Sequence, residues 1–241
     1  FARFFILRRC IMPLQYVPFE HIVLPRPIDR IQFIIQSVTD KKVLDLGCWD
    51  ETALVKKGNH FWLHEEIAKM SSTTIGIDNS LYLPDEGVTY DKSIVIKGDI
   101  TRKEILMGYD VDIIIAGELI EHLPNTLQFL SLIKDCYLGK HLIITTPNTT
   151  NISNCILALF GRESCHRDHL QVYSFKTLTT ICDKSSFRSY RIIPYHVKFT
   201  EMILHEKGVR KAIVKMFERM VNVFEDLFPM LSGGYIIDIS L

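Results

Sequence analysis

The chain has 241 residues, which is enough for one α/β domain with a sizeable core. It carries 28 lysines and arginines against 28 aspartates and glutamates, so no overall charge gathers nucleic acid or an anionic membrane. Its hydrophobic content of 47% is ordinary for a soluble globular protein, and no apolar run approaches the roughly 18 residues that span a bilayer.

The first 27 residues are predicted to be an N-terminal extension, followed by one domain over residues 28–241. Residues 1–11 are apolar and basic, but they lack a small-residue cleavage site and make a poor secretory signal. We expect translation to start at Met12 and residues 1–11 to be extraneous, with a membrane-surface anchor as the alternative. Four prolines predict a loop over residues 13–27.

The six cysteines include no Cys-x-x-Cys pair. We interpret them as reduced thiols of a cytoplasmic protein that has no zinc site. Cys48 differs from the others in its position, because it comes directly after the first predicted strand and its glycine.

A short apolar run over residues 43–46 stops abruptly at Gly47, as expected of a buried parallel strand. Gly47 has no Cβ, so the backbone there can turn sharply and a ligand can come close. Asp45 lies near the carboxyl end of this strand, where ligands of open α/β sheets bind. We interpret Asp45 as a residue that orders the amides of the loop.

The same pattern recurs in three later runs, which end at Asp78, Asp99 and Glu118. Four such strands would bring carboxylates together along one edge of a sheet, where they accept hydrogen bonds from hydroxyls and amines. The spacing from Gly47 to Asp78 is longer than the about 20 residues usual in dinucleotide-binding folds. An extra loop or turn is therefore expected between them.

Apolar periodicity predicts the remaining elements. The expected helices cover residues 28–37, 51–57, 61–70, 127–137, 152–160, 175–182 and 209–227, with Ser174 as an N-cap. The expected later strands cover residues 142–148, 188–200 and 234–241. The helix over residues 209–227 has one strongly apolar face, which we assign to the core or a lid, with a homodimer or membrane surface as the alternative.

Five motifs occur in order along the chain: Val-Leu-Asp-Leu-Gly-Cys at 43–48, Gly-Ile-Asp at 76–78, Gly-Asp-Ile at 98–100, Gly-Glu-Leu-Ile-Glu-His-Leu-Pro-Asn at 117–125 and Leu-Ile-Ile-Thr-Thr-Pro-Asn at 142–148. Together they resemble the class I S-adenosylmethionine-dependent methyltransferases over about residues 28–190. The resemblance implies an α/β fold: a Rossmann-like three-layer sandwich with a mostly parallel seven-stranded sheet and an antiparallel last strand.

The resemblance also implies S-adenosyl-L-methionine as the cofactor and assigns residues to it. Asp78 would hold the ribose hydroxyls, although an acid at a strand end can also cap the next helix. Asp99 would lie beside the adenine, and Glu118 would face the cofactor. The full set of expected cofactor residues is Asp45, Gly47, Cys48, Asp78, Asn79, Asp99, Ile100 and Glu118.

The first loop departs from the family pattern. The family usually has Gly-x-Gly-x-Gly there, but Trp49 and Glu51 occupy the later glycine positions. Similar relatives with a Trp-Leu-His helix, like residues 62–64 here, also lack those glycines. We interpret the departure as a trait of that subgroup.

Glu118, Glu121 and His122 would share one face of a helical turn, because they are spaced by three and four residues. With His169 from a distant loop they could bind a divalent metal, as in the small-RNA 2′-O-methyltransferases that this motif resembles. We favour a metal-free site in which His169 lies too far from His122 to share an ion. Either histidine is then the candidate catalytic base for a hydroxyl acceptor.

These motifs predict an S-adenosylmethionine-dependent methyltransferase that acts on a small molecule, glycan or lipid-linked acceptor, similar to the ubiquinone-pathway O-methyltransferases. Metal-dependent RNA 2′-O-methylation is the alternative, and the zero net charge and the lack of an evident basic face disfavour it. The missing glycines disfavour a nicotinamide oxidoreductase. A non-catalytic ligand-binding relative stays open because of Trp49.

Overall fold

The computed structural model describes residues 20–49, 53–90 and 92–241, and all structural statements concern these residues. The expectations for residues 1–11, for a start at Met12 and for Glu51 lie outside them.

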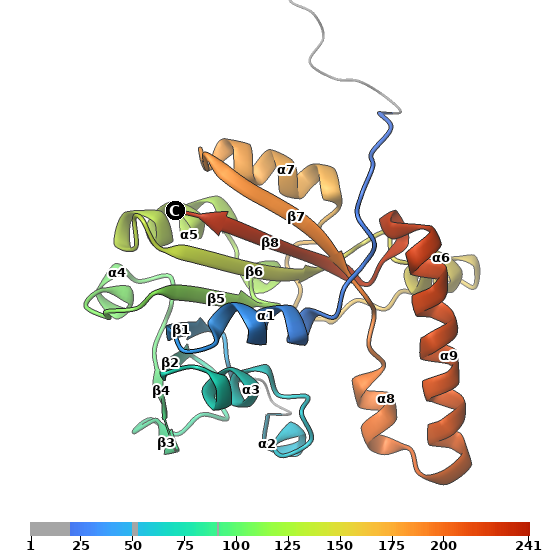
Figure 1. The fold of residues 1–241 in the computed structure, drawn as a ribbon, viewed down its shortest axis with the longest axis horizontal. Coiled ribbons are helices and arrows are strands. Elements are labelled where there is room, and N and C mark those ends of the chain that lie inside the picture. The colour runs from blue at the N-terminus through green and yellow to red at the C-terminus, as the bar shows by residue number, and fades with distance from the viewer. Residues whose placement is uncertain (1–19, 50–52, 91) are drawn as a thin grey trace, which may run out of the picture.

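One sheet runs through the centre of the molecule, in the strand order β3-β4-β2-β1-β5-β6-β8-β7 (Figure 1). Its strands are β1 Lys42–Leu46, β2 Thr73–Asp78, β3 Val88–Tyr90, β4 Ser93–Lys97, β5 Ile113–Gly117, β6 His141–Pro147, β7 Ser189–Tyr195 and β8 Gly234–Ser240. The pairs among β1, β2, β4, β5 and β6 are parallel, and β8 is antiparallel to both β6 and β7. The predicted antiparallel last strand is confirmed.

The described residues form eight strands, so the predicted number of seven is wrong. The additional strand is β3, which pairs antiparallel with β4 at the edge of the sheet. It has only three residues, too few for an alternating pattern to be recognised in the sequence.

The α-helices are α1 Arg30–Val38, α2 Ala53–Lys56, α3 Leu63–Met70, α4 Lys103–Leu106, α5 Thr126–Cys136, α6 Ile152–Leu159, α7 Phe175–Lys184, α8 Thr200–His205 and α9 Gly208–Leu227. The predicted helices correspond to α1, α2, α3, α5, α6, α7 and α9, and the Ser174 side chain caps α7 as expected. The predicted strand over residues 188–200 is too long, because β7 ends at Tyr195 and α8 begins at Thr200. No described helix is both long and apolar enough to cross a bilayer.

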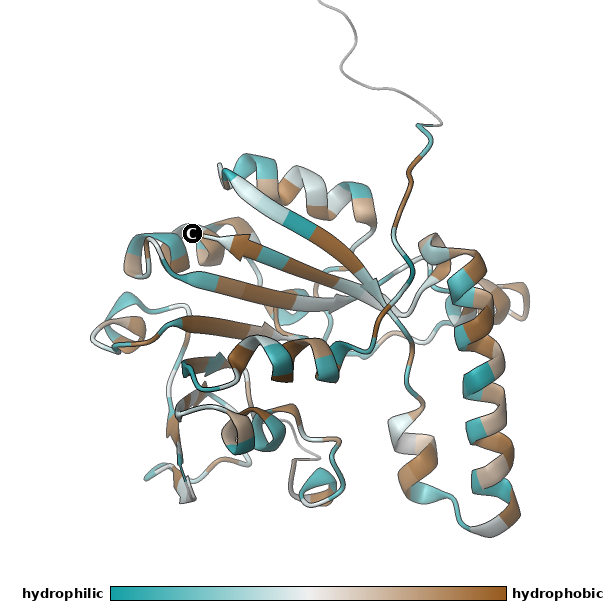
Figure 2. Ribbon diagram, in the orientation of Figure 1, coloured by the Kyte–Doolittle hydropathy of each residue, from teal (hydrophilic) through white to brown (hydrophobic). Residues whose placement is uncertain are grey.

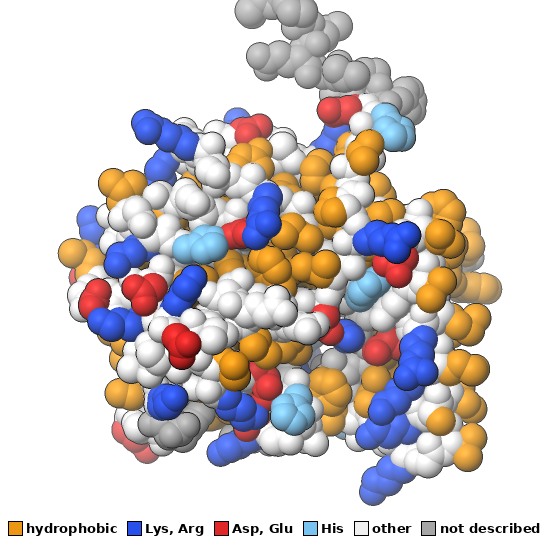
Figure 3. Space-filling model, in the orientation of Figure 1, with side chains coloured by type: hydrophobic (Ala, Val, Ile, Leu, Met, Phe, Trp, Pro, Cys, Tyr) orange, Lys and Arg blue, Asp and Glu red, His pale blue; other side chains and the backbone are white. Residues whose placement is uncertain are grey.

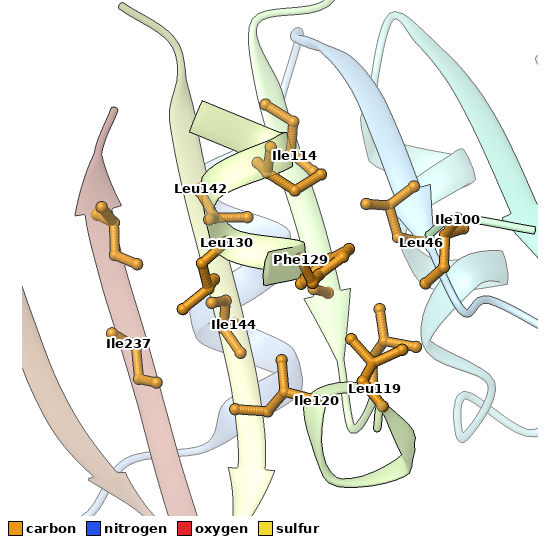
Figure 4. Close-up of a cluster of buried hydrophobic side chains, with 14 of the residues drawn as sticks. Leu46, Ile100, Ile114, Leu119, Ile120, Phe129, Leu130, Leu142, Ile144 and Ile237 are labelled. Carbon is orange, nitrogen blue, oxygen red and sulfur yellow. The ribbon is translucent and has the colours of Figure 1, made fainter. Parts of the chain in front are cut away.

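Two apolar layers cover the sheet. On one face, Phe129 and Leu130 of α5 and Leu178 of α7 pack with strand residues such as Ile144 (Figure 4). On the other face, α1 and α3 contribute side chains to a second cluster: Ile34, Val38 and Ile67. Figure 2 shows the apolar character of the central strands. The three-layer sandwich is therefore confirmed, and its helices leave the carboxyl ends of β1, β2 and β5 accessible to a ligand.

Candidate functional site

A cavity of about 820 Å³ lies at the carboxyl ends of β1, β2 and β5. Gly47, Asp78 and Glu118 line it where these strands end, and Met202 of α8 also lines its wall. The volume is within the range of about 300–1,000 Å³ found for small-molecule sites. The structure thus brings three of the expected carboxyl-end residues to one cavity, as the strand pattern predicted.

The Asp78 carboxylate is buried at the end of β2 and contacts two backbone amides. Its Oδ2 accepts from the Trp49 amide at 2.8 Å, and its Oδ1 accepts from the Ser80 amide at 2.7 Å. The second bond is the local capping contact that an acid at a strand end commonly makes. A carboxylate offers about four acceptor positions and can accept hydrogen bonds from hydroxyls as well as from amides.

The loop after β1 is held by a glycine and by two tryptophans. Gly47 has a φ of 71°, and a Cβ there would lie 2.7 Å from Leu119 Cδ1. Trp49 is buried edge-on against Trp62, with 5.3 Å between ring centroids, and Trp62 Nε1 donates to the Cys48 carbonyl at 2.8 Å. Aromatic packing therefore orders the loop where the usual later glycines are missing. Burial raises the pKa of the Cys48 thiol, which keeps it neutral.

Asp45 orders a helix rather than the loop amides, which corrects the expectation from the sequence. Its Oδ2 lies 2.7 Å from Nδ1 of His64, and Nε2 of His64 lies 2.7 Å from Oγ of Ser93. All three side chains are buried. This chain of hydrogen bonds fixes α3 against β1 and β4.

Three further residues expected to bind the cofactor divide into two groups. Ile100 and Asn79 line the cavity. Asp99 is not among the described residues that line it, and its Oδ1 accepts two hydrogen bonds from Thr101, at 2.9 and 2.7 Å. The Thr101 hydroxyl is the main cause that lowers the pKa of Asp99.

Glu118 is fixed by residues to which the motifs assigned no role. It has a φ of 53°, and its Oε1 accepts from Arg30 at 2.9 Å, from the Tyr195 hydroxyl at 2.7 Å and from Thr145 at 3.1 Å. Burial, and then the Glu118 charge, raise the pKa of Tyr195. The role of Arg30 could have been predicted, because Arg30 lies in the helix that was expected before the first strand. No sequence pattern near Tyr195 indicated that its hydroxyl would contact Glu118.

Three histidines gather at the mouth of the cavity. His122 ends the short turn η1 Ile120–His122, and its ring centroid lies 4.7 Å from that of His169. His166, which the sequence motifs did not identify, lies 5.8 Å from His169 between ring centroids. The expectation that His169 is too far from His122 to share an ion is therefore wrong. The reason lies in the backbone, because the amide of Leu170 donates to the Glu121 carbonyl at 2.8 Å and holds the distant loop against η1.

Glu121 is buried beneath these histidines. Its Oε2 accepts from Thr146 at 3.0 Å, whereas its Oε1 has no hydrogen-bond partner among the described residues. Burial, and then the nearby charge of Glu118, raise the pKa of Glu121 to about 8. Burial, and then the charge of His122, lower the pKa of His169.

Three of the four proposed metal ligands form a compact group. One donor atom from each of Glu121, His122 and His169 lies within 4.8 Å of the others. An ion at about 2.0–2.3 Å from each donor fits that spacing. Glu118 is not in the group, since Arg30 and Tyr195 hold its carboxylate. The expectation of a metal-free site remains a prediction.

No protein-family model matches the chain. The chain is 22% identical over 198 residues to the glutamyl-tRNA reductase of Methanosarcina mazei, covering 81% of this chain and 41% of that protein. It is 29% identical over 119 residues to the ubiquinone biosynthesis O-methyltransferase of Histophilus somni, covering 44% of each protein. The chain thus spans less than half the length of these curated relatives.

Solved structures of methyltransferases have the same fold. A SAM-dependent methyltransferase from Archaeoglobus fulgidus superimposes with a TM-score of 0.53 at 18% identity, covering 88% of this chain and 91% of that one. The small RNA methyltransferase HEN1 superimposes with a TM-score of 0.53 at 18% identity, covering 88% of this chain and 25% of that one. The chain therefore has the fold of the S-adenosylmethionine-dependent methyltransferases, as the motif series predicted.

Proposed function

We propose that the protein is an S-adenosylmethionine-dependent methyltransferase that acts on a small molecule, glycan or lipid-linked acceptor. The observation that carries the proposal is the convergence of Asp78 and the Glu118–Arg30 pair in one cavity at the strand ends. This is where ligands of open α/β sheets bind.

The residues of the cavity fit this cofactor. The positive φ of Gly47 leaves backbone where a ligand can approach closely. The Asp78 carboxylate suits the ribose hydroxyls because carboxylates accept hydrogen bonds from hydroxyls, and the cofactor's ammonium group suits Glu118. The Arg30 guanidinium has five donors, so it can bind the cofactor carboxylate while it keeps its bond to Glu118.

S-adenosylmethionine supplies a methyl group on a sulfonium that is already strongly electrophilic. The protein then has two tasks, which are to hold the acceptor in line and to accept its proton. We propose that His122 or His169, at the mouth of the cavity, accepts the proton of the acceptor hydroxyl. The lowered pKa of His169 supports this role, because a neutral imidazole can accept a proton at pH 7.

Calorimetry with S-adenosylhomocysteine tests the proposal. We expect binding by the unmodified protein and a loss of about 1–3 kcal/mol in Asp78→Asn, which weakens the ribose acceptor. Asp99→Asn is the matched control and should bind nearly normally, because Asp99 bonds to its own loop. Tight binding of NADP without binding of S-adenosylhomocysteine would overturn the assignment.

A second candidate is metal-dependent 2′-O-methylation of RNA. The grouping of Glu121, His122 and His169 favours it, and so does the buried Glu121 oxygen that has no hydrogen-bond partner in the described part of the chain. When bound, a divalent ion would lower the pKa of an acceptor hydroxyl. These three side chains would hold it, and Glu118 would stay with Arg30.

Direct metal binding separates the two candidates without an activity assay. If the second candidate function is right, Mn²⁺ binds the unmodified protein in a paramagnetic-resonance titration. The His169→Ala variant should then no longer bind Mn²⁺. His166→Ala is the control, because His166 is outside the three-donor group. Absence of Mn²⁺ binding at millimolar concentration would leave the metal-free mechanism.

A further inference from the structure

Helix α9 exposes most of its apolar side chains to solvent, although Phe217 also stacks on Phe199. Its exposed apolar residues are each at least 37% accessible, and they recur at spacings of three and four residues along one face. They are Val209, Ile213, Met216, Phe217, Met220, Val223, Phe224 and Leu227. We call this set the outer face of α9.

The inward side of α9 is held largely by polar contacts. Glu225 is fully buried and accepts from the Val197 amide at 3.2 Å and contacts His196 Nδ1 at 2.9 Å. Glu218 accepts from the Phe199 amide at 2.7 Å. An ordinary surface helix buries its apolar stripe, whereas α9 exposes its larger apolar stripe and buries only Val221 and Glu225. The predicted core role of its apolar face is therefore wrong.

Basic side chains lie along α9 beside and behind the outer face, with Arg210 and Arg219 at its edges. Lys207, Arg210, Lys215 and Arg219 are exposed, and Lys211 is half-buried. None of these five cations makes a salt bridge within residues 20–49, 53–90 and 92–241. Figure 3 shows lysine and arginine side chains along α9, with hydrophobic ones at its outer edge. The expectation of no evident basic face is corrected by this helix.

We propose that the outer face of α9 docks the protein on an anionic lipid bilayer. A helix with an apolar face flanked by lysine and arginine lies in the plane of the membrane interface, where both parts are satisfied. The apolar side chains enter the acyl boundary, and the cations meet anionic headgroups. The net charge of zero does not oppose this, because the attraction acts over a Debye length of about 8 Å.

Two other binding partners would complement only part of this surface. RNA would neutralise the cations but would leave the apolar stripe exposed. A second copy of the chain would cover the stripe, but a two-fold contact centred on the helix would bring the Arg219 side chains of both copies near each other at its edge. Such juxtaposition of like charges is costly.

Docking through α9 would place the cavity beside the membrane. The neighbouring α8 segment supplies Phe199, Thr200 and Met202 to the cavity wall, and Phe199 stacks on Phe217 of α9. Given the proposed function, on which this step rests, the arrangement favours a lipid-linked acceptor over a freely diffusing one. The docking itself does not depend on methyl transfer.

Vesicle flotation of the full chain tests the docking. We expect the protein to float with phosphatidylcholine–phosphatidylserine vesicles and much less with phosphatidylcholine alone. Lys215→Gln combined with Arg219→Gln should lower the partition coefficient about 25-fold, since each cation contributes about fivefold. Met216→Ser combined with Met220→Ser should abolish flotation. The matched controls are Arg102→Gln and Leu138→Ser, which alter exposed side chains outside α9.

Circular dichroism and S-adenosylhomocysteine binding on the same variants show that each remains folded, which separates failure of docking from failure of the proposed function. Flotation that is equal in the α9 variants and the controls overturns the proposal. The proposal is also overturned if the unmodified protein does not float with anionic vesicles. Light scattering would then test for a dimer, and an RNA gel shift would test for RNA binding.

Discussion

The hydroxyl of Tyr195 donates a hydrogen bond of 2.7 Å to the carboxylate of Glu118, across 77 residues of chain. The same carboxylate oxygen accepts from Arg30 at 2.9 Å. One acid at the exit of β5 therefore joins the end of β7 and the start of α1. These bonds hold α1 and β7 beside the cavity.

Tyr195→Phe removes one of these bonds and leaves the ring in place. We expect it to lower the free energy of unfolding by about 1–2 kcal/mol, because the Tyr195 hydroxyl is buried and Glu118 loses a donor. Urea denaturation measures the change. Tyr190→Phe is the control, whose hydroxyl contacts Asp183 at an exposed position and should contribute less. Equal losses of unfolding free energy in the two variants would show that burial does not strengthen the bond between Tyr195 and Glu118.

His64→Ala breaks the buried chain from Asp45 to Ser93. It leaves the Asp45 carboxylate without its imidazole, and we expect a loss of about 3 kcal/mol or more in unfolding free energy. His60→Ala removes another histidine–carboxylate contact, but His60 is 77% exposed and should change stability little. A small effect at His64 would show that the network is not needed to hold α3.

Glu121 makes stability depend on pH in a defined direction. Its pKa of about 8 in the folded state exceeds its ordinary value of 4.5, so the folded state binds more protons between these values. Its contribution is therefore fully present below pH 4.5 and is lost as the pH rises through 8. Glu121→Gln removes this loss.

We expect the stability of Glu121→Gln relative to the unmodified protein to rise by about 1–3 kcal/mol between pH 5 and 8. Chemical denaturation at several pH values, with a chelator present, measures it. A difference that stays constant over this range would mean that Glu121 is ionised in the folded protein throughout.

Gly47→Ala and Gly58→Ala separate backbone strain from a steric clash. Both glycines have a positive φ, but a Cβ at position 47 would lie 2.7 Å from Leu119 Cδ1, whereas one at position 58 would meet no atom of the described residues within 4 Å. We expect about 1 kcal/mol of destabilisation from strain at each site. Gly47→Ala should cost more than Gly58→Ala and should weaken S-adenosylhomocysteine binding. Thermal denaturation and calorimetry compare them, and equal stability losses would show that Leu119 simply moves away.

Much of the fold is determined by local sequence. Parallel strands buried on both faces need continuous apolar runs, so the strands that end at Leu46, Asp78 and Gly117 were predictable from these runs alone. Because parallel strands end at a common edge, the meeting of Asp78 and Glu118 in one cavity was predictable as well. The short β3 was not, since three residues carry too little pattern.

Only the tertiary structure decided which distant groups meet. The Glu121 carbonyl holds the amide of Leu170, and this backbone bond brings His169 to His122 without any side-chain signature. The partners of Glu118 likewise depend on where β7 lies in the sheet. For α9, periodicity established an apolar stripe but not its direction, which is set by the burial of Glu225 against residues 196–197. A sequence specifies the period of a helix locally, whereas the face that turns outward depends on contacts with the whole fold.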